Sequence, residues 1–162
     1  MQKLKETINQ CYDLIKKCET KRNILMQKHY SITNKIEEMT ELIGDPENAE
    51  IKKLEQQLMI VVEEMREQES QYETADTEVL TPARALSYLQ IVLRFMQLLC
   101  ENHNLELQNM LREQINEDGN VSGKTFDFIS HLARMVGEFY KIFSSTTCDL
   151  GQQMIDSLVE FI

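Results

Sequence analysis

Basic residues are scarce in this sequence relative to acidic ones. Its 162 residues include 17 Lys or Arg against 27 Asp or Glu, which gives a formal net charge of -10 at pH 7. A chain with this charge repels phosphate backbones and anionic lipid, and the sequence holds no local basic patch to offset the repulsion. The composition therefore argues against a nucleic acid or a membrane surface as the partner.

Long apolar runs are also missing. The most hydrophobic stretch, Leu86 to Cys100, is interrupted by Gln90, Arg94 and Gln97, whereas a membrane-spanning helix needs roughly 20 consecutive apolar residues. The first residues, Met-Gln-Lys-Leu-Lys-Glu-Thr, lack the apolar core and small-residue cleavage site of a secretory signal. We therefore expect no membrane insertion by this segment and exposure to the cytoplasm.

The sequence lacks the motifs of catalysis and ligand binding. It has no glycine-rich phosphate loop, no Ser-His-Asp arrangement, no aromatic and basic interleaving and no EF-hand loop. Cys100 and His103 are three residues apart, but no second Cys or His pair has the spacing of a zinc site, and the neighbouring leucines raise the pKa of the thiol. We predict no catalytic, cofactor-binding or metal-binding residue, and hence no enzyme.

The four cysteines do not indicate a disulfide framework. Cys11 and Cys18 lie two turns apart on one helix face, about 10 Å by helical rise, which is too far for a bridge. Together with Cys100 and Cys148, they are better interpreted as small apolar fillers in a reducing compartment.

What the first half does contain is an unbroken heptad pattern. Twelve positions alternate in steps of four and three, and ten of them are apolar, which is the 3.5-residue repeat of a left-handed supercoil. They are Leu4, Ile8, Cys11, Ile15, Cys18, Arg22, Leu25, His29, Ile32, Ile36, Met39 and Ile43. The pattern predicts one long helix that needs a partner helix, with Arg22 and His29 as polar seam residues that fix the register.

A turn and a second helix follow. Gly44-Asp45-Pro46 ends the first helix, and the same stepping resumes at Ile51, Leu54, Leu58, Val61, Met65, Gln68, Tyr72, Ala75 and Val79. We predict an antiparallel coiled-coil hairpin over residues 1–80, in which Ile43 faces Ile51 and Val79 faces Ile15. A parallel homodimeric coiled coil remains the alternative. Residues 4–11 then overhang, and the second half, a second copy or another protein could cover them.

The second half, residues 81–162, is less charged and more apolar, which predicts a compact helical body. Thr81-Pro82 begins a helix whose apolar residues leave little polar face, so we expect it to be surrounded. Further helices are expected from Leu105 to Gln114, with Leu107, Met110 and Leu111 on one side, from Thr125 to Phe143, and from Asp149 to Ile162, separated by a polar loop at 116–120 and a break at Ser144–Thr147. The last stripe is still apolar at Ile162, so we expect the chain to be part of a longer protein.

One stretch identifies a relationship. Residues 93–112 read Leu-Arg-Phe-Met-Gln-Leu-Leu-Cys-Glu-Asn-His-Asn-Leu-Glu-Leu-Gln-Asn-Met-Leu-Arg, and they closely resemble the homology-associated domain of inositol trisphosphate receptors and ryanodine receptors. The resemblance weakens towards Ile162, where Ser157-Leu-Val-Glu-Phe161 is similar to a later segment of that domain, and it does not extend into residues 1–80. It covers about half of the chain.

The resemblance implies an all-α segment built of stacked helix pairs, in the cytosolic part of a tetrameric calcium-release channel. Such solenoids contact neighbours in sequence and transmit rigid-body displacement. We expect a non-catalytic structural and coupling role at the cytosolic face of the endoplasmic reticulum, with protein partners or other segments of a larger polypeptide, or as a homo-oligomer. The alternative is a freestanding scaffold or cytoskeletal or ciliary adaptor that carries the same helical module.

Overall fold

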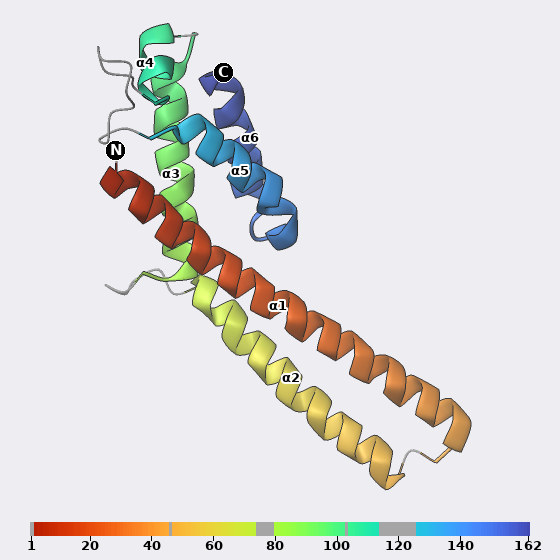
Figure 1. Ribbon diagram of the computed structural model, residues 1–162. Coiled ribbons are helices and arrows are strands. Elements are labelled where there is room, and N and C mark those ends of the chain that lie inside the picture. The colour runs from red at the N-terminus through yellow and green to blue at the C-terminus, as the bar shows by residue number, and fades with distance from the viewer. Residues whose placement is uncertain (1, 46, 74–79, 103, 114–125) are drawn as a thin grey trace.

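The computed structural model describes residues 2–45, 47–73, 80–102, 104–113 and 126–162. All regular structure in these ranges is helical, and no strand occurs in them, so the prediction of an all-α fold is confirmed. None of the helices in these ranges has the length and hydrophobicity needed to cross a membrane. The chain divides visibly into a long two-helix rod and a bundle of shorter helices at one end of it (Figure 1).

The rod consists of α1 (Gln2–Ile43) and α2 (Ala49–Glu73), which lie side by side and run in opposite directions (Figure 1). Gly44 ends α1 with a φ of +65°, and its N–H donates to Thr40 O at 3.0 Å. Such a left-handed residue is the usual helix cap because glycine adopts it without strain. Asn48 Oδ1 then accepts from Glu50 N at 2.9 Å and caps the start of α2.

The burial of α2 follows the four-and-three stepping of the sequence. Between residues 51 and 70, every buried or half-buried residue stands at a stepping position, and all others are exposed. The six are Ile51, Leu54, Leu58, Val61, Met65 and Gln68. The face of α2 that lies against α1 is therefore the apolar seam, while supercoiling of the pair stays a prediction.

The predicted register of this pair is wrong. It placed Ile43 opposite Ile51, but in the structure Gln68 Nε2 donates to Cys18 Sγ, so residues of α2 lie against earlier residues of α1 than expected. If Ala49, the first residue of α2, lay level with Ile43, Gln68 would lie opposite residue 24. Its contact with Cys18 therefore means that the last turns of α1 extend past the start of α2. Ile43 is accordingly 43% exposed instead of buried in the seam. Ala75 and Val79, also assigned to the seam, lie outside the described residues.

The bundle contains α3 (Pro82–Cys100), α4 (Leu105–Met110), α5 (Phe128–Phe139), a short 3-10 helix η1 (Tyr140–Ile142) and α6 (Cys148–Phe161). Thr81 Oγ1 accepts from Arg84 N at 3.3 Å and Pro82 occupies the first turn of α3, as predicted. Asn104 and Asp127 cap α4 and α5 with their side chains. The Ser144–Thr147 break is present, and the buried Thr147 hydroxyl donates to Ile142 O at 2.7 Å.

Several predicted boundaries and burials differ from the structure. The helix expected from Leu105 to Gln114 ends at Met110, and the one expected from Thr125 to Phe143 turns into a 3-10 helix at Tyr140. Part of each predicted apolar stripe lies on a helix face that no neighbouring described helix covers. Met110, Ala133, Tyr140, Phe143, Ile155, Val159 and Ile162 are exposed. The polar loop at 116–120 lies outside the described residues.

The main core joins the two halves of the sequence. Ile8, Cys11, Tyr12 and Ile15 of α1 belong to the same cluster of buried residues as Leu89 and Leu93 of α3 and Met154 and Phe161 of α6. The second half of the chain therefore covers the overhanging part of α1. The division into units at 1–80 and 81–162 stays a prediction. The first turns of α1 pack against the helices of the second unit.

Helix α3 is not surrounded, contrary to the prediction. Ala85, Leu89, Leu93, Met96 and Cys100 face α1 and α6 and are buried, but the opposite side is open. On that side Ile91 is 68% exposed and Phe95 60% exposed. Helices α1 and α6 make most of the contacts with α3, whereas α2 and α4 contact it less, and the side that carries Ile91 and Phe95 stays exposed.

Candidate functional site

The junction between rod and bundle is made by polar contacts along one side of α1. The Tyr12 hydroxyl donates to Met135 O of α5 at 3.1 Å, and Lys16 Nζ pairs with Glu138 Oε2 at 2.9 Å. Nearly two turns further along α1, Arg22 Nη1 donates to Thr146 Oγ1 at 2.8 Å, in the segment before α6. These three contacts fix α1 to α5 and to the start of α6 over about three helical turns.

Burial and charge set the chemistry of this junction. Burial raises the pKa of Tyr12 to about 12, and the nearby Glu138 and Asp13 carboxylates contribute in the same direction. The hydrogen bond and charge of Lys16 lower the pKa of Glu138. The Tyr12 phenol is thus held protonated as a donor, and the charged form of the Glu138 carboxylate is favoured beside Lys16.

Arg22 has a different role from the one predicted. The heptad pattern assigned it to the seam as a register residue, whereas its guanidinium extends to the bundle and also lies 3.7 Å from Glu19 Oε2. Glu19 is fully buried beside it. His29, the other polar seam residue, is half-buried.

The sequence reasoning missed Tyr12, Lys16, Glu138 and Thr146. A signal was present, because Tyr12 and Lys16 each follow a heptad position by one residue, which places them on a flank of the seam about 100° away from its centre. Only the folded structure shows that this flank meets α5.

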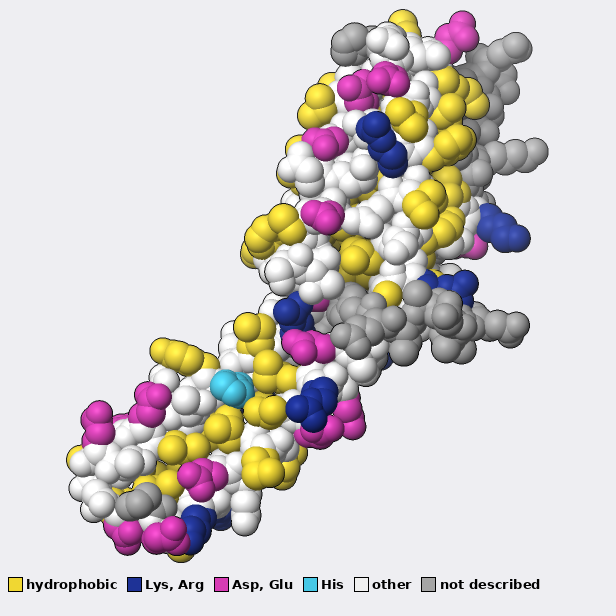
Figure 2. Space-filling view, turned by 180° about the vertical axis from the view of Figure 1, so that it is seen from behind, with side chains coloured by type: hydrophobic (Ala, Val, Ile, Leu, Met, Phe, Trp, Pro, Cys, Tyr) yellow, Lys and Arg dark blue, Asp and Glu magenta, His cyan; other side chains and the backbone are white. Residues whose placement is uncertain are grey.

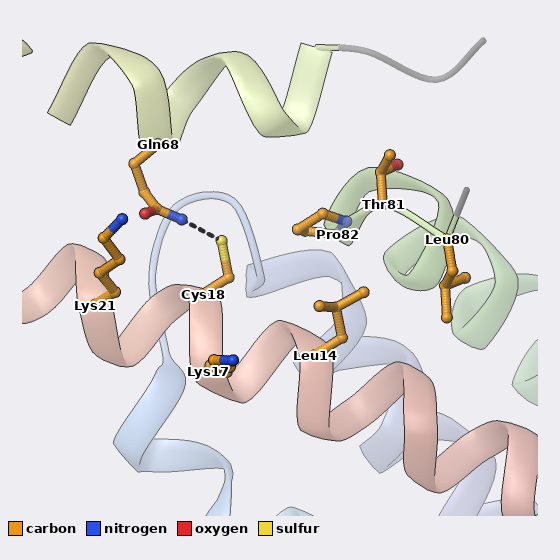
Figure 3. A pocket seen from close by; sticks show the side chains of 8 residues that line it. All are labelled: Leu14, Lys17, Cys18, Lys21, Gln68, Leu80, Thr81 and Pro82. Atoms are coloured by element: carbon orange, nitrogen blue, oxygen red, sulfur yellow. Dashed lines mark hydrogen bonds between the residues drawn. The ribbon is translucent and has the colours of Figure 1, made fainter. Parts of the chain in front are cut away.

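A cavity of about 460 Å³ lies where α1, α2 and the start of α3 meet (Figure 3). Figure 3 shows Lys17 and Lys21 beside Gln68 and Cys18 on one side and Leu14 towards Leu80, Thr81 and Pro82 on the other. The lining residues that the structure describes include no carboxylate and no imidazole.

A second hollow, of about 330 Å³, is almost entirely apolar and runs over α3 and α4. Its lining includes Leu4, Val92, Phe95, Met96, Leu99, Cys100, Leu107, Met110 and Leu111. Figure 2 shows hydrophobic side chains spread over this end of the molecule from behind. A surface of this kind suits packing against another apolar surface.

The residues considered for chemistry are not brought together. Burial raises the pKa of the Cys100 thiol, as predicted from its neighbours, and His103 lies outside the described residues. Within the described ranges, no group of three His, Cys, Asp or Glu side chains is arranged to hold a metal ion.

The second half of the chain is similar to a known protein family. Residues 83–162 match the model of the family described as RyR and IP3R Homology associated. A segment of 60 residues, 36% of this chain, is 43% identical to the inositol 1,4,5-trisphosphate receptor itr-1 of Caenorhabditis elegans. The match agrees with the predicted resemblance and its place in the sequence, and it supports a segment associated with calcium-release channels.

The matched segment is a small part of that relative. It spans 2% of the length of the Caenorhabditis elegans receptor, and α1 and α2 lie outside the family match. No solved structure matches this chain.

Proposed function

From the match of residues 83–162 and the geometry of the junction, we propose that this chain is a non-catalytic coupling segment of a calcium-release-channel-like protein. In this role it lies on the cytosolic face of the endoplasmic reticulum, within a larger assembly. Its partners are other protein segments, which it contacts through packed surfaces. The chain transmits displacement and does not conduct ions by itself.

The observation that carries the proposal is the continuity of α1. This helix has 42 residues, which corresponds to about 63 Å. Its first turns belong to the bundle core, and the remainder forms the rod with α2. A continuous helix resists bending, so a force on the rod rotates the part of α1 that α3 and α5 contact.

The contacts of α1 with the bundle can pass such a displacement on to α5 and α6. Tyr12 and Lys16 hold α5, and Arg22 holds the segment that leads into α6. Helix α6 in turn packs along α3, where the Ser157 hydroxyl lies 3.3 Å from Leu93 O. Movement of α1 therefore reaches α6 through two routes, which is how stacked helices transmit rigid-body motion.

A chimera tests the proposal. Residues 83–162 of this chain, which match the family model, would replace their counterparts in the Caenorhabditis elegans receptor. Ligand-evoked calcium release would then be measured in cells without other release channels. The proposal predicts that the chimera releases calcium, and that the same chimera with Leu93→Asp, which places a charge in the bundle core, does not. A chimera that assembles and binds ligand but releases no calcium would contradict it.

The alternative, a freestanding scaffold or adaptor, draws on one observation: exposed apolar residues on the outside of the rod, such as Met59 and Ile60. These residues suit a contact with another helix whatever the bundle does. An adaptor would bind its partner through the rod and leave the chimera inactive.

A further inference from the structure

The outward face of α2 carries a second stripe of residues at heptad spacing. Its members are separated by steps of three and four, and all are exposed. We call them the outer stripe: Lys52, Glu55, Met59, Val62, Arg66 and Glu69. Heptad spacing on an exposed face is the pattern by which one helix contacts another along its length.

The outer stripe does not take part in the contact with α1. Each member follows a position of the α1-facing seam by one residue, and one residue corresponds to a rotation of about 100°. Met59 is 73% exposed and Val62 is 41% exposed, although both are large and apolar. The centre of the stripe is thus an uncovered apolar pair with charged residues on both sides of it.

The outer stripe is complementary in charge to the outer stripe of a second copy that runs in the opposite direction. In an antiparallel pair of two such helices, Met59 lies opposite Val62 of the other copy, Glu55 opposite Arg66, and Lys52 opposite Glu69. Each of these pairs occurs twice, and every charged residue meets its opposite. In a parallel pair each charge would meet an identical charge.

Existing contacts do not prevent this exchange. Lys52 pairs with Glu47, and Arg66 Nη1 lies 3.4 Å from Glu63 Oε2, within the same helix or its entry loop. The side chains in these pairs are at least half exposed to solvent, and such surface pairs contribute little to stability. Lys52 and Arg66 can turn to a partner without a large loss.

We propose that two copies of this chain associate through their outer stripes, with the α2 helices antiparallel about a two-fold axis between Met59 and Val62. The apolar centre supplies affinity, and the charged flanks set direction and register. This contact does not depend on the proposed channel role. A rotation axis parallel to α2 relates α2 helices that run in the same direction. The antiparallel contact therefore joins two copies that such an axis does not relate.

Charge reversal tests the pairing in the chain as it exists. Sedimentation velocity across a dilution series is expected to show wild-type particles of twice the 19.0 kDa chain mass. Glu55→Arg places an arginine opposite Arg66 of the other copy on both sides of the apolar centre and should raise the dimer dissociation constant about tenfold or more. The double variant Glu55→Arg with Arg66→Glu restores opposite charges and should restore the dimer.

A matched control uses the same helix. Glu67→Arg makes the same change of charge, but Glu67 is an exposed residue that precedes the seam position Gln68, on the other flank of α2. It should leave the dissociation constant unchanged. A monomeric wild type, an equal effect of Glu67→Arg, or failure of the double variant to recover would each overturn the proposal.

Cross-linking tests direction independently of affinity. In a Cys148→Ser background, which removes the exposed native thiol, Glu55→Cys combined with Arg66→Cys should form a covalent dimer on mild oxidation. The two new thiols of one chain are about 16 Å apart along the helix and cannot bridge. Glu55→Cys alone should not cross-link, and a covalent dimer from the single variant would indicate a parallel pair and contradict the proposal.

Discussion

Tyr12 links the rod to the bundle through both its buried ring and its hydroxyl. It is 6% exposed, packs in the main core and donates to Met135 O. Its neighbour Lys16 forms the charged contact of the same junction at the edge of solvent. Among the polar contacts that attach the rod to the bundle, Tyr12 supplies a buried neutral hydrogen bond and Lys16 a partly exposed ion pair, and the buried bond is the one that stability measurements can resolve.

Replacing Tyr12 by Phe removes the hydroxyl and keeps the ring. Below pH 10 the variant should be less stable by about 1 kcal/mol, because the hydrogen bond to Met135 O is lost. Burial raises the pKa of Tyr12 to about 12 from 10.0, so folding favours the protonated phenol. This contribution is complete below pH 10 and is lost as the pH rises towards 12.

Urea unfolding of both proteins between pH 8 and pH 12 measures the effect. In that upper range the wild type should lose stability relative to Tyr12→Phe by about 1.4 kcal/mol for each pH unit, so the advantage of the wild type shrinks and reverses. Parallel pH profiles for the two proteins would show that the Tyr12 phenol is not held protonated by the fold.

At the scale of the element, α6 packs against α5 at a glycine. A Cβ on Gly151 of α6 would lie 2.5 Å from Cε1 of Phe139, whereas a Cβ on Gly137 of α5 would meet nothing within 4 Å. Both glycines are helical. Substitutions at the two positions therefore distinguish the effect of close packing from the general cost of glycine in a helix.

The paired alanine variants should shift stability in opposite directions. Gly137→Ala should stabilise the chain by about 0.5 to 1 kcal/mol, since alanine loses less backbone entropy. Gly151→Ala should destabilise it by about 1 to 2 kcal/mol, because the Phe139 ring must move out of the core. Thermal unfolding under identical conditions compares them, and equal shifts in both variants would mean that α5 and α6 do not pack as described.

The elements differ in how far the sequence determines them. The seam of α2 follows from spacing alone, because exposure in a two-helix contact depends only on angular position. The register with α1 does not, because it depends on how the loop between the two helices places the start of α2 along α1. The coverage of α3 and the junction at Tyr12 and Lys16 depend on which helices reach which face, and local pattern holds no information on that.

At the scale of the whole molecule, α1 is the one helix among the described residues that belongs to both rod and bundle. The proposed coupling role depends on this continuity, and the proposed antiparallel contact of α2 places a second copy on the rod, away from the bundle core. The family match covers the bundle helices from α3 onwards but not the rod. The rod therefore adds a contact surface to the helices that match the family.

The distance between the rod and the bundle tests this continuity most directly. Spin labels on the exposed Cys148 at the start of α6 and on Glu41→Cys near the end of α1 would be measured in the Glu55→Arg background, so that distances between copies do not contribute. The rise of α1 between the level of Thr146 and residue 41 predicts a separation of about 30 Å. The account predicts one narrow distance distribution, which Asn23→Pro broadens by interrupting α1 and Asn23→Ala leaves narrow. A broad wild-type distribution that Asn23→Pro does not change would contradict it.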